Sequence, residues 1–255
     1  MRLILVISIP FIVLFLHCTS DPPAKKGSKT IDHELWSLLL KKHVDSNGYV
    51  DYSGFLKDSL SFGAYLDQLT THPPDEDNWP EEEQIAFWIN AYNAFTIKLI
   101  IDHYPVESIK DIGSIIQLPF VNSPWDIRFI EMQGEKLDLN NIEHSILRKK
   151  FEEPRIHFAI NCASNSCPKL RREAYTGQKL NNQLNDQAYN FINDPNRNYI
   201  QDQQAELSKI FSWFKEDFTK KSTLKEFLNQ YSTIKLHDNT MVSFKNYDWS
   251  LNERH

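Results

Sequence analysis

The chain has 255 residues, of which 41% are hydrophobic and 24% are charged, and these proportions predict a folded domain with a sizeable core rather than a disordered or collagen-like chain. Its 28 Lys and Arg residues against 34 Asp and Glu residues give a formal net charge of -6, which argues against a surface that neutralises phosphates, so we expect no nucleic-acid partner. The 7 glycines form neither a GxGxxG nor a Walker-type loop, which excludes the two standard nucleotide cradles.

The first 30 residues are predicted to be a targeting segment. Met1 and Arg2 give a positive start, and residues 3–16 are mostly apolar. A helix of that length spans about 21 Å, less than the hydrocarbon thickness of about 30 Å. This pattern therefore favours a signal peptide over a membrane-spanning helix.

Cys18 lies just after this apolar stretch. The sequence FLHCTSD at residues 15–21 resembles a bacterial lipoprotein signal, in which the cysteine becomes the acylated first residue of the mature protein. The resemblance implies a lipid anchor on Cys18 that holds the protein at a membrane of the bacterial cell envelope, facing the periplasm or the cell surface. It divides the chain into a signal peptide (1–17), a linker (18–30) and one folded domain (31–255). A cleaved soluble protein and an uncleaved anchor are the alternatives.

Apolar spacing predicts helices over residues 31–43, about 62–69 and 81–103. The third helix follows Pro80 and starts with three glutamates, as the helix dipole favours. Its apolar residues cover more than one stripe, so we expect it to be buried and to form the spine of the core. Asn90 and Asn93 lie one turn apart in it, and because buried amides need partners they either bond neighbouring backbone or line a site.

Residues 127–132 and 136–139 flank Gln133 and Gly134 and predict a β-hairpin. Asn140, followed three positions later by Glu143, predicts a capping box at the start of a helix that runs to about residue 150. His144 and Arg148 share one face of this helix, either as a solvated pair or as part of a site.

Residues 155–161 predict a central strand, in which the period of two places His157 and Asn161 on the same face. A loop follows at 162–169. Helices over about 180–191, 210–218 and 224–231, a strand at 198–200 and an aromatic tail that packs back at 244–252 complete the chain. These elements predict a single α+β domain, rich in helix, with a small, mostly antiparallel sheet and a long buried central helix.

Five segments also resemble one protein family in their order along the chain. They are AFWINAYNA (86–94), IEHSILR (142–148), HFAINCASNSCP (157–168), LSKIF (207–211) and YDWSLN (247–252). They resemble the blocks of the domain of unknown function 547 family, and the resemblance covers nearly the whole mature chain. It implies a fold unit found in secreted bacterial proteins and beside coiled-coil segments in plant proteins, without an agreed activity.

The chemistry therefore depends on four residues: Cys162, Cys167, His144 and His157. One hypothesis is a non-catalytic binding or scaffold domain, in which the two cysteines form a structural disulfide and the partner is a protein, peptide or small molecule. Envelope proteins occupy a compartment that permits disulfides. Candidate binding residues are Asn90, Asn93, Glu143, Arg148 and Asn161.

The alternative is a cysteine-dependent hydrolase or acyltransferase that acts on an amide or ester. Cys167 precedes Pro168, a residue preferred at the first position of a helix, so a helix start there would stabilise its thiolate. His144 or His157 would be the base, Asn161 would orient it or donate to an oxyanion, and Cys162 is a second candidate nucleophile. The sequence leaves open whether the chain is an enzyme.

A zinc-binding domain is a third hypothesis, less favoured than the other two. Two cysteines and two histidines supply the right ligand types, but the Cys spacing is at the wide end of the usual range and both histidines precede it. The Cys-x-x-Cys spacing of redox proteins is absent. We therefore expect neither a metal nor a cofactor.

Overall fold

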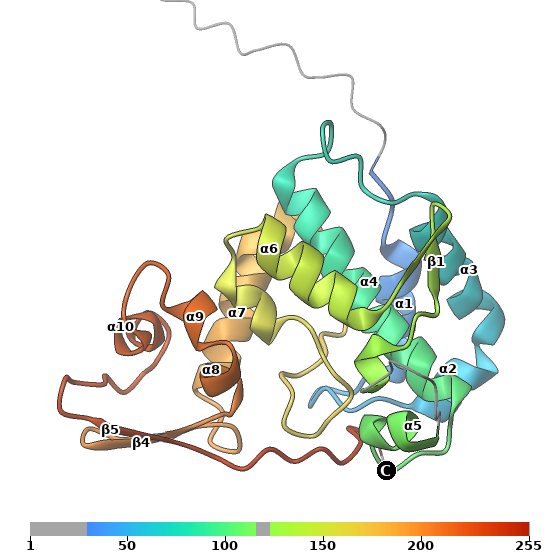
Figure 1. Cartoon of the computed structure of the whole chain (residues 1–255). Coiled ribbons are helices and arrows are strands. Elements are labelled where there is room, and N and C mark those ends of the chain that lie inside the picture. The colour runs from blue at the N-terminus through green and yellow to red at the C-terminus, as the bar shows by residue number, and fades with distance from the viewer. Residues whose placement is uncertain (1–29, 116–122, 255) are drawn as a thin grey trace, which may run out of the picture.

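The computed structural model describes residues 30–115 and 123–254 (Figure 1). The predicted signal peptide, Cys18 and nearly all of the predicted linker lie outside these residues. Within them, no helix has the length and apolar character needed to cross a membrane.

The N-terminal part of the described chain is helical. The predicted helices over 31–43, 62–69 and 81–103 are all present, and a further short helix precedes the second of them. The helices are α1 (Glu34–His43), α2 (Tyr52–Lys57), α3 (Ser59–Thr71), α4 (Glu81–Asp102) and α5 (Ile109–Ile115).

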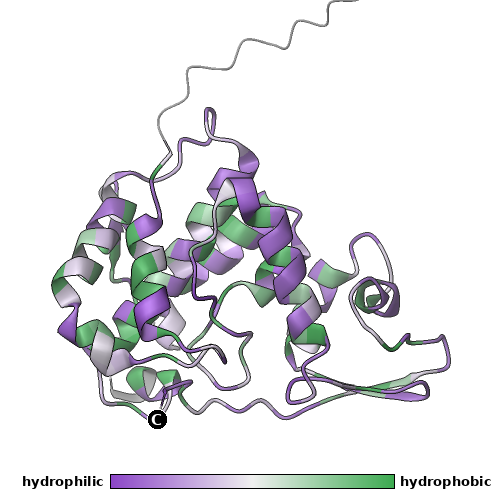
Figure 2. Cartoon of the chain, turned by 180° about the vertical axis from the view of Figure 1, so that it is seen from behind, coloured by the Kyte–Doolittle hydropathy of each residue, from purple (hydrophilic) through white to green (hydrophobic). Residues whose placement is uncertain are grey.

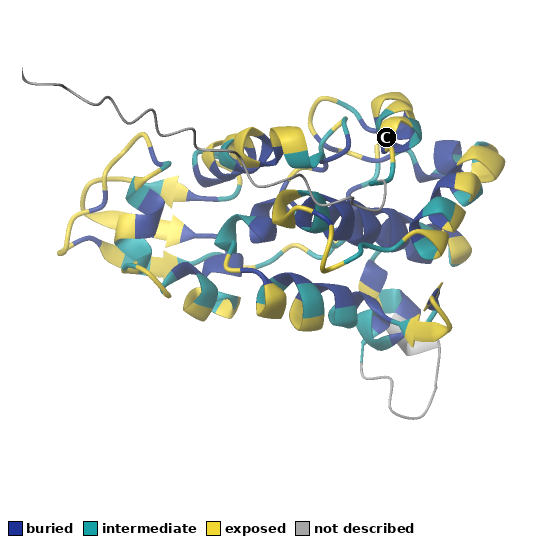
Figure 3. Ribbon diagram, turned by 90° about the horizontal axis from the view of Figure 1, so that it is seen from above, coloured by how far each residue is buried: buried dark blue, intermediate teal, exposed yellow. Residues whose placement is uncertain are grey.

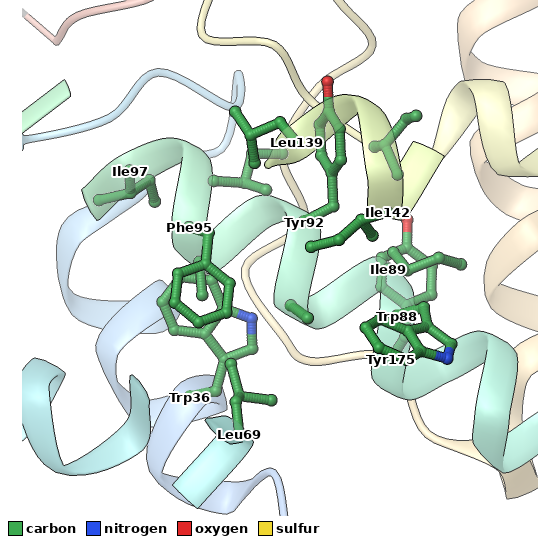
Figure 4. Packing of buried hydrophobic residues seen from close by; sticks show 14 of the residues in the cluster. Trp36, Leu69, Trp88, Ile89, Tyr92, Phe95, Ile97, Leu139, Ile142 and Tyr175 are labelled. Atoms are coloured by element: carbon green, nitrogen blue, oxygen red, sulfur yellow. The ribbon is translucent and has the colours of Figure 1, made fainter. Parts of the chain in front are cut away.

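Helix α4 is the spine of the core, as its apolar pattern predicts. Sixteen of its 22 residues are buried, and α2 and α3 pack against it. Figure 3 shows buried residues along the middle of the molecule, and Figure 2 shows the hydrophobic faces of the helices turned inward. Figure 4 shows Tyr92 and Phe95 among the side chains that α4 contributes to this core. Each such side chain contributes roughly 1.5–3 kcal/mol by burial.

The predicted hairpin is formed by β1 (Ile130–Met132) and β2 (Glu135–Leu137), which pair antiparallel. Gln133 and Gly134 both have positive φ, at 51° and 82°, as a tight turn between two strands requires. The short 3-10 helix η1 (Pro124–Asp126) precedes the hairpin.

A helix over the predicted range of about 140–150 is present, but the predicted capping box is wrong. It comprises η2 (Asn141–Leu147), which has π-helical hydrogen bonding, and α6 (Arg148–Lys150). The Asn140 amide donates to Asp126 instead, and the Asp138 carboxylate accepts the Asn141 N–H at 2.7 Å. Glu143 is buried, so its carboxyl group faces inward rather than back to the helix start.

The predicted strand over residues 155–161 is also wrong, because the segment begins with the 3-10 helix η3 (Pro154–Phe158). Pro154 suits the first helical position, and the Glu153 carboxylate accepts the Arg155 N–H at 3.0 Å. Ile156, His157 and Phe158 are all buried, so the alternation between two faces that a strand would show does not apply.

The C-terminal part contains the predicted helices near 180–191, 210–218 and 224–231 and a three-stranded sheet. The sheet has the order β3-β4-β5, with β3 antiparallel and β5 parallel to β4, so it is mixed. The elements are η4 (Gly177–Lys179), α7 (Leu180–Ile192), β3 (Tyr199–Ile200), β4 (Gln204–Leu207), α8 (Ile210–Trp213), α9 (Lys215–Phe218), α10 (Leu224–Asn229) and β5 (Met241–Phe244).

The aromatic tail packs back on the domain, as predicted. After β5 the chain runs along the molecule to end beside α5 (Figure 1). The Val50 N–H donates to the Asn252 carbonyl at 2.9 Å, and the Leu251 N–H donates to the Glu107 carbonyl at 2.8 Å. The described chain is therefore a single α+β domain, rich in helix, and its tail brings residues 247–252 beside segments far away in the sequence.

Candidate functional site

One pocket brings together all four predicted catalytic candidates. Cys162, Cys167, His144 and His157 line a cavity of about 220 Å³, together with Glu143. Glu143 and His144 come from η2, His157 comes from η3, and the cysteines come from the loop that follows. The pocket therefore lies where these three segments meet.

The two cysteines are bonded to each other as a disulfide. Their Cα atoms are 6.3 Å apart, within the range that disulfides adopt. The Cys167 sulfur also lies 3.0 Å from the Cys162 N–H and 3.2 Å from the Tyr247 hydroxyl. The helix start at Pro168 on which the enzyme hypothesis relies is absent, since residues 168–176 are irregular, so no helix dipole acts on Cys167.

Two of the predicted binding residues hold this loop in place instead of lining the pocket. The Asn161 side chain accepts the Ala163 N–H at 2.8 Å and donates to the Pro168 carbonyl at 2.7 Å. The Asn93 side chain, from α4, accepts the Asn161 N–H at 2.8 Å and donates to the Ala159 carbonyl at 3.0 Å. Ala163 has a φ of 61°, a strained conformation for this residue that the surrounding hydrogen bonds maintain.

Asn90 has the same kind of role one turn earlier on α4. Its side chain donates to the Tyr175 carbonyl at 2.8 Å and accepts the Tyr175 N–H at 2.9 Å. Of the two roles open to Asn90 and Asn93 from the sequence, the structure therefore shows bonding to backbone.

His157 is buried and its hydrogen bonding is incomplete. Its Nε2 atom lies 2.8 Å from Asp217 Oδ2, its ring stacks on Phe214 with centroids 3.9 Å apart, and its Nδ1 atom has no partner. Burial lowers the pKa of His157 to about 4, although the bond to Asp217 opposes the shift. The imidazole is therefore neutral at neutral pH, with its proton on Nε2.

Arg148 is bound on both sides by residues of the same chain. Its Nε donates to Asp217 at 2.6 Å, and its Nη1 donates to His144 Nδ1 at 2.8 Å. Burial raises the pKa of Asp217, but the bonds from His157 and Arg148 outweigh this effect and lower it. Arg148 therefore completes a charged network and does not line the pocket. The sequence around Asp217 does not indicate that this residue belongs to the site, because it lies on a short, charged helix.

Glu143 contributes a buried carboxyl group to the pocket. The residue is 7% exposed, and burial raises the pKa of Glu143 to about 7, with Arg148 and a hydrogen bond from the Tyr92 hydroxyl opposing the shift. Figure 4 shows Tyr92 extending from α4 toward the segment that carries Leu139 and Ile142. A perturbed carboxyl group in a pocket marks a candidate functional site.

Aromatic side chains form much of the pocket wall. The Tyr247 ring centroid lies 4.7 Å from that of Trp213 and 4.6 Å from that of Trp249, and Trp125 packs on Trp249 at 5.6 Å. Trp213 is 45% exposed. The sequence predicts that the tail packs back but does not indicate that it lines a pocket. The aromatic lining residues are Tyr92, Trp125, Trp213, Phe214, Tyr247 and Trp249.

Metal ligands do not gather in the described ranges, 30–115 and 123–254. There, no group of three or more His, Cys, Asp or Glu side chains is placed to hold a metal ion.

Comparison with known proteins identifies a family for the middle of the chain. Residues 76–192 match the family described as "Protein of unknown function, DUF547". Neither a search of curated proteins nor a search of solved structures found a match. The matched segment includes α4, η2 and the cysteine loop, whereas Trp213, Tyr247 and Trp249 lie beyond it. The chain is therefore similar to the DUF547 family over residues 76–192, slightly less than half of its length.

Proposed function

We propose that this chain is a ligand-binding domain whose pocket takes a small molecule beside Glu143. One observation carries the proposal: a buried carboxyl group, a disulfide-closed loop and six aromatic side chains converge on one cavity. Ligand pockets are typically apolar and aromatic, with a few polar groups that fix the orientation of the ligand.

The disulfide supports binding over catalysis. With both sulfurs bonded, neither Cys162 nor Cys167 presents a thiolate, and the proton of His157 is held toward Asp217. Closing so short a loop stabilises the fold by about 2 kcal/mol in the chain-entropy model. The covalent bond and the Asn161 hydrogen bonds together make this wall of the pocket rigid, which lowers the entropy cost of binding.

A screen of small molecules tests this function. Ligand-observed NMR is run on the wild type and on two variants, Trp213→Ala, which removes an exposed wall of the pocket, and Tyr189→Ala, which removes a similarly exposed ring from α7 outside it. We expect ligands that bind the wild type and Tyr189→Ala but bind Trp213→Ala about tenfold more weakly or worse. Absence of ligands, or equal binding by all three proteins, contradicts the proposal.

We also propose that the domain is a lipoprotein of the bacterial cell envelope, anchored through Cys18. The support is the signal-like N-terminal sequence, together with a disulfide, which persists in oxidising compartments. Mass spectrometry of the protein expressed in a bacterium should find acyl chains on Cys18 and no residue before it. A soluble, non-acylated product contradicts this location.

Cysteine-dependent acyl transfer is a second candidate, favoured by the surroundings of Cys167. If a dithiol reduces the disulfide, the Cys162 N–H and the hydroxyls of Ser164 and Tyr247 are placed to donate to a thiolate at Cys167. The reduced wild type should then react with iodoacetamide at Cys167 at about pH 6 and hydrolyse a test ester, whereas Cys167→Ala does neither. Slow labelling typical of an ordinary thiol excludes this candidate.

A further inference from the structure

We propose that the ligand of this pocket is an organic cation, with an ammonium group held between the aromatic rings and the Glu143 carboxylate. The inference rests on the proposed ligand-binding function and adds to it the chemical class of the ligand.

The aromatic wall is the first support. Trp213, Tyr247 and Trp249 pack against one another, with centroids 4.6–5.7 Å apart, and present a continuous set of rings to the pocket. The face of an aromatic ring is electronegative, and indole attracts cations most strongly. Several such rings in one cavity are the arrangement that recognises ammonium groups.

Two rings of the pocket already contact cations of the chain itself. Lys110 Nζ lies 4.2 Å from the centre of a Trp249 ring, and the Arg148 guanidinium carbon lies 5.0 Å from the centre of the Phe214 ring. These contacts show that the faces of both rings attract positive charge at the edge of the pocket.

Glu143 is the second support, because the attraction of Arg148 and the hydrogen bond from Tyr92 offset its burial only in part. Among the residues that the structure describes, no Lys, Arg or His forms an ion pair with Glu143, and the nearby Arg148 is bound to Asp217 instead. An ionised carboxylate in so buried a position requires a partner. An ammonium group that enters the pocket supplies it, and the cavity has about 220 Å³ for a small one.

The other charges around the pocket disfavour an anion. Asp217 lies behind His157, and burial lowers the pKa of both His157 and His144, so both rings are neutral at neutral pH. Arg148 is neutralised by Asp217. An anionic ligand would therefore meet the Glu143 carboxylate and the negative faces of the rings. The cations Lys110 and Arg197 contact the pocket wall at the Trp249 ring and at the Cys167 carbonyl, and neither forms an ion pair with Glu143.

Choline and its neutral isostere 3,3-dimethyl-1-butanol test the inference, since the two molecules share their shape and differ in charge. Their affinities are measured by calorimetry at about pH 8, where Glu143 is ionised. The proteins are the wild type, Glu143→Gln, and Glu135→Gln as a control that removes an exposed carboxylate of the β2 strand outside the pocket. Trp213→Ala provides a second pocket variant that alters an exposed position.

We expect the wild type and Glu135→Gln to bind choline at least about tenfold more tightly than the neutral alcohol. Glu143→Gln should lose most of this preference while it binds the alcohol as before, and Trp213→Ala should weaken the binding of choline. Equal affinity of the wild type for the two molecules, or an unchanged preference in Glu143→Gln, overturns the cationic ligand but leaves a ligand pocket. Failure of both molecules to bind overturns the inference, and with a screen that finds no ligand it overturns the proposed function too.

Discussion

Replacement of Glu143 by Gln should stabilise the protein at high pH and not at low pH. Burial raises the pKa of this carboxyl group from 4.5 to about 7 in the folded chain. Between these values the unfolded chain has released the proton that the folded chain still holds, so the stability of the wild type falls as pH rises through this window. The shift corresponds to about 3 kcal/mol, and Gln, which does not titrate, avoids this loss.

The assay is denaturant unfolding of both proteins at about pH 4 and about pH 8. The difference in unfolding free energy between Glu143→Gln and the wild type should change by about 3 kcal/mol in favour of Gln between the two conditions, which corresponds to roughly 6–12 °C in Tm. His33 and His157 titrate in both proteins, so their contributions cancel in this difference. A difference that is the same at both pH values would refute the raised pKa of this buried carboxyl group.

Three further predictions concern the groups around the pocket. Cys162→Ser and Cys167→Ser should each lower the unfolding free energy by about 2 kcal/mol under oxidising conditions; unequal losses, or none, contradict a closed disulfide. Asn93→Ala should cost about 1–3 kcal/mol because it leaves buried backbone groups without partners, whereas Asn190→Ala, an exposed control, should change stability by about 0.5 kcal/mol or less. NMR should find His157 neutral down to about pH 4. Because its pKa is lowered in the folded chain, its contribution to the unfolding free energy is complete above about pH 6.5 and is lost as the pH falls toward 4. Protonation of His157 near pH 6.5 would contradict its burial.

The strongly periodic elements of the fold are predictable from the sequence. Helix α4 is found because its long apolar run leaves no alternative, and the β1–β2 hairpin is found because Gly134 allows the turn. The strand predicted at 155–161 fails because Pro154 and the Glu153 cap favour a 3-10 turn over an extended chain. Strands β4 and β5 escape prediction because four-residue strands pair in parallel across a long separation in the sequence.

The candidate site is predictable only in part. The cysteines and histidines are recognised by residue type, and the structure brings them together in one pocket. Asp217 and Tyr92 carry no local signal, because their roles depend on which segments meet in space. The aromatic wall depends on the tail, whose hydrogen bonds to segments near Val50 and Glu107 hold Trp249 in place. Glu143 is assigned to a helix cap from its spacing, whereas the π-helical turn directs it inward.

The central claim is that a buried carboxyl group pairs with a cationic ligand. The release of protons on binding tests this claim most directly. Calorimetry of choline binding at about pH 7 in two buffers of different ionisation enthalpy measures it. Because the pKa of Glu143 is about 7, binding should release about half a proton per choline from the wild type and none from Glu143→Gln. Tyr92, Arg148, Asp217 and Tyr247, the other groups that act on this carboxyl, are the same in both proteins. Heats that do not depend on the buffer in the wild type, or that depend on it equally in both proteins, would contradict the account.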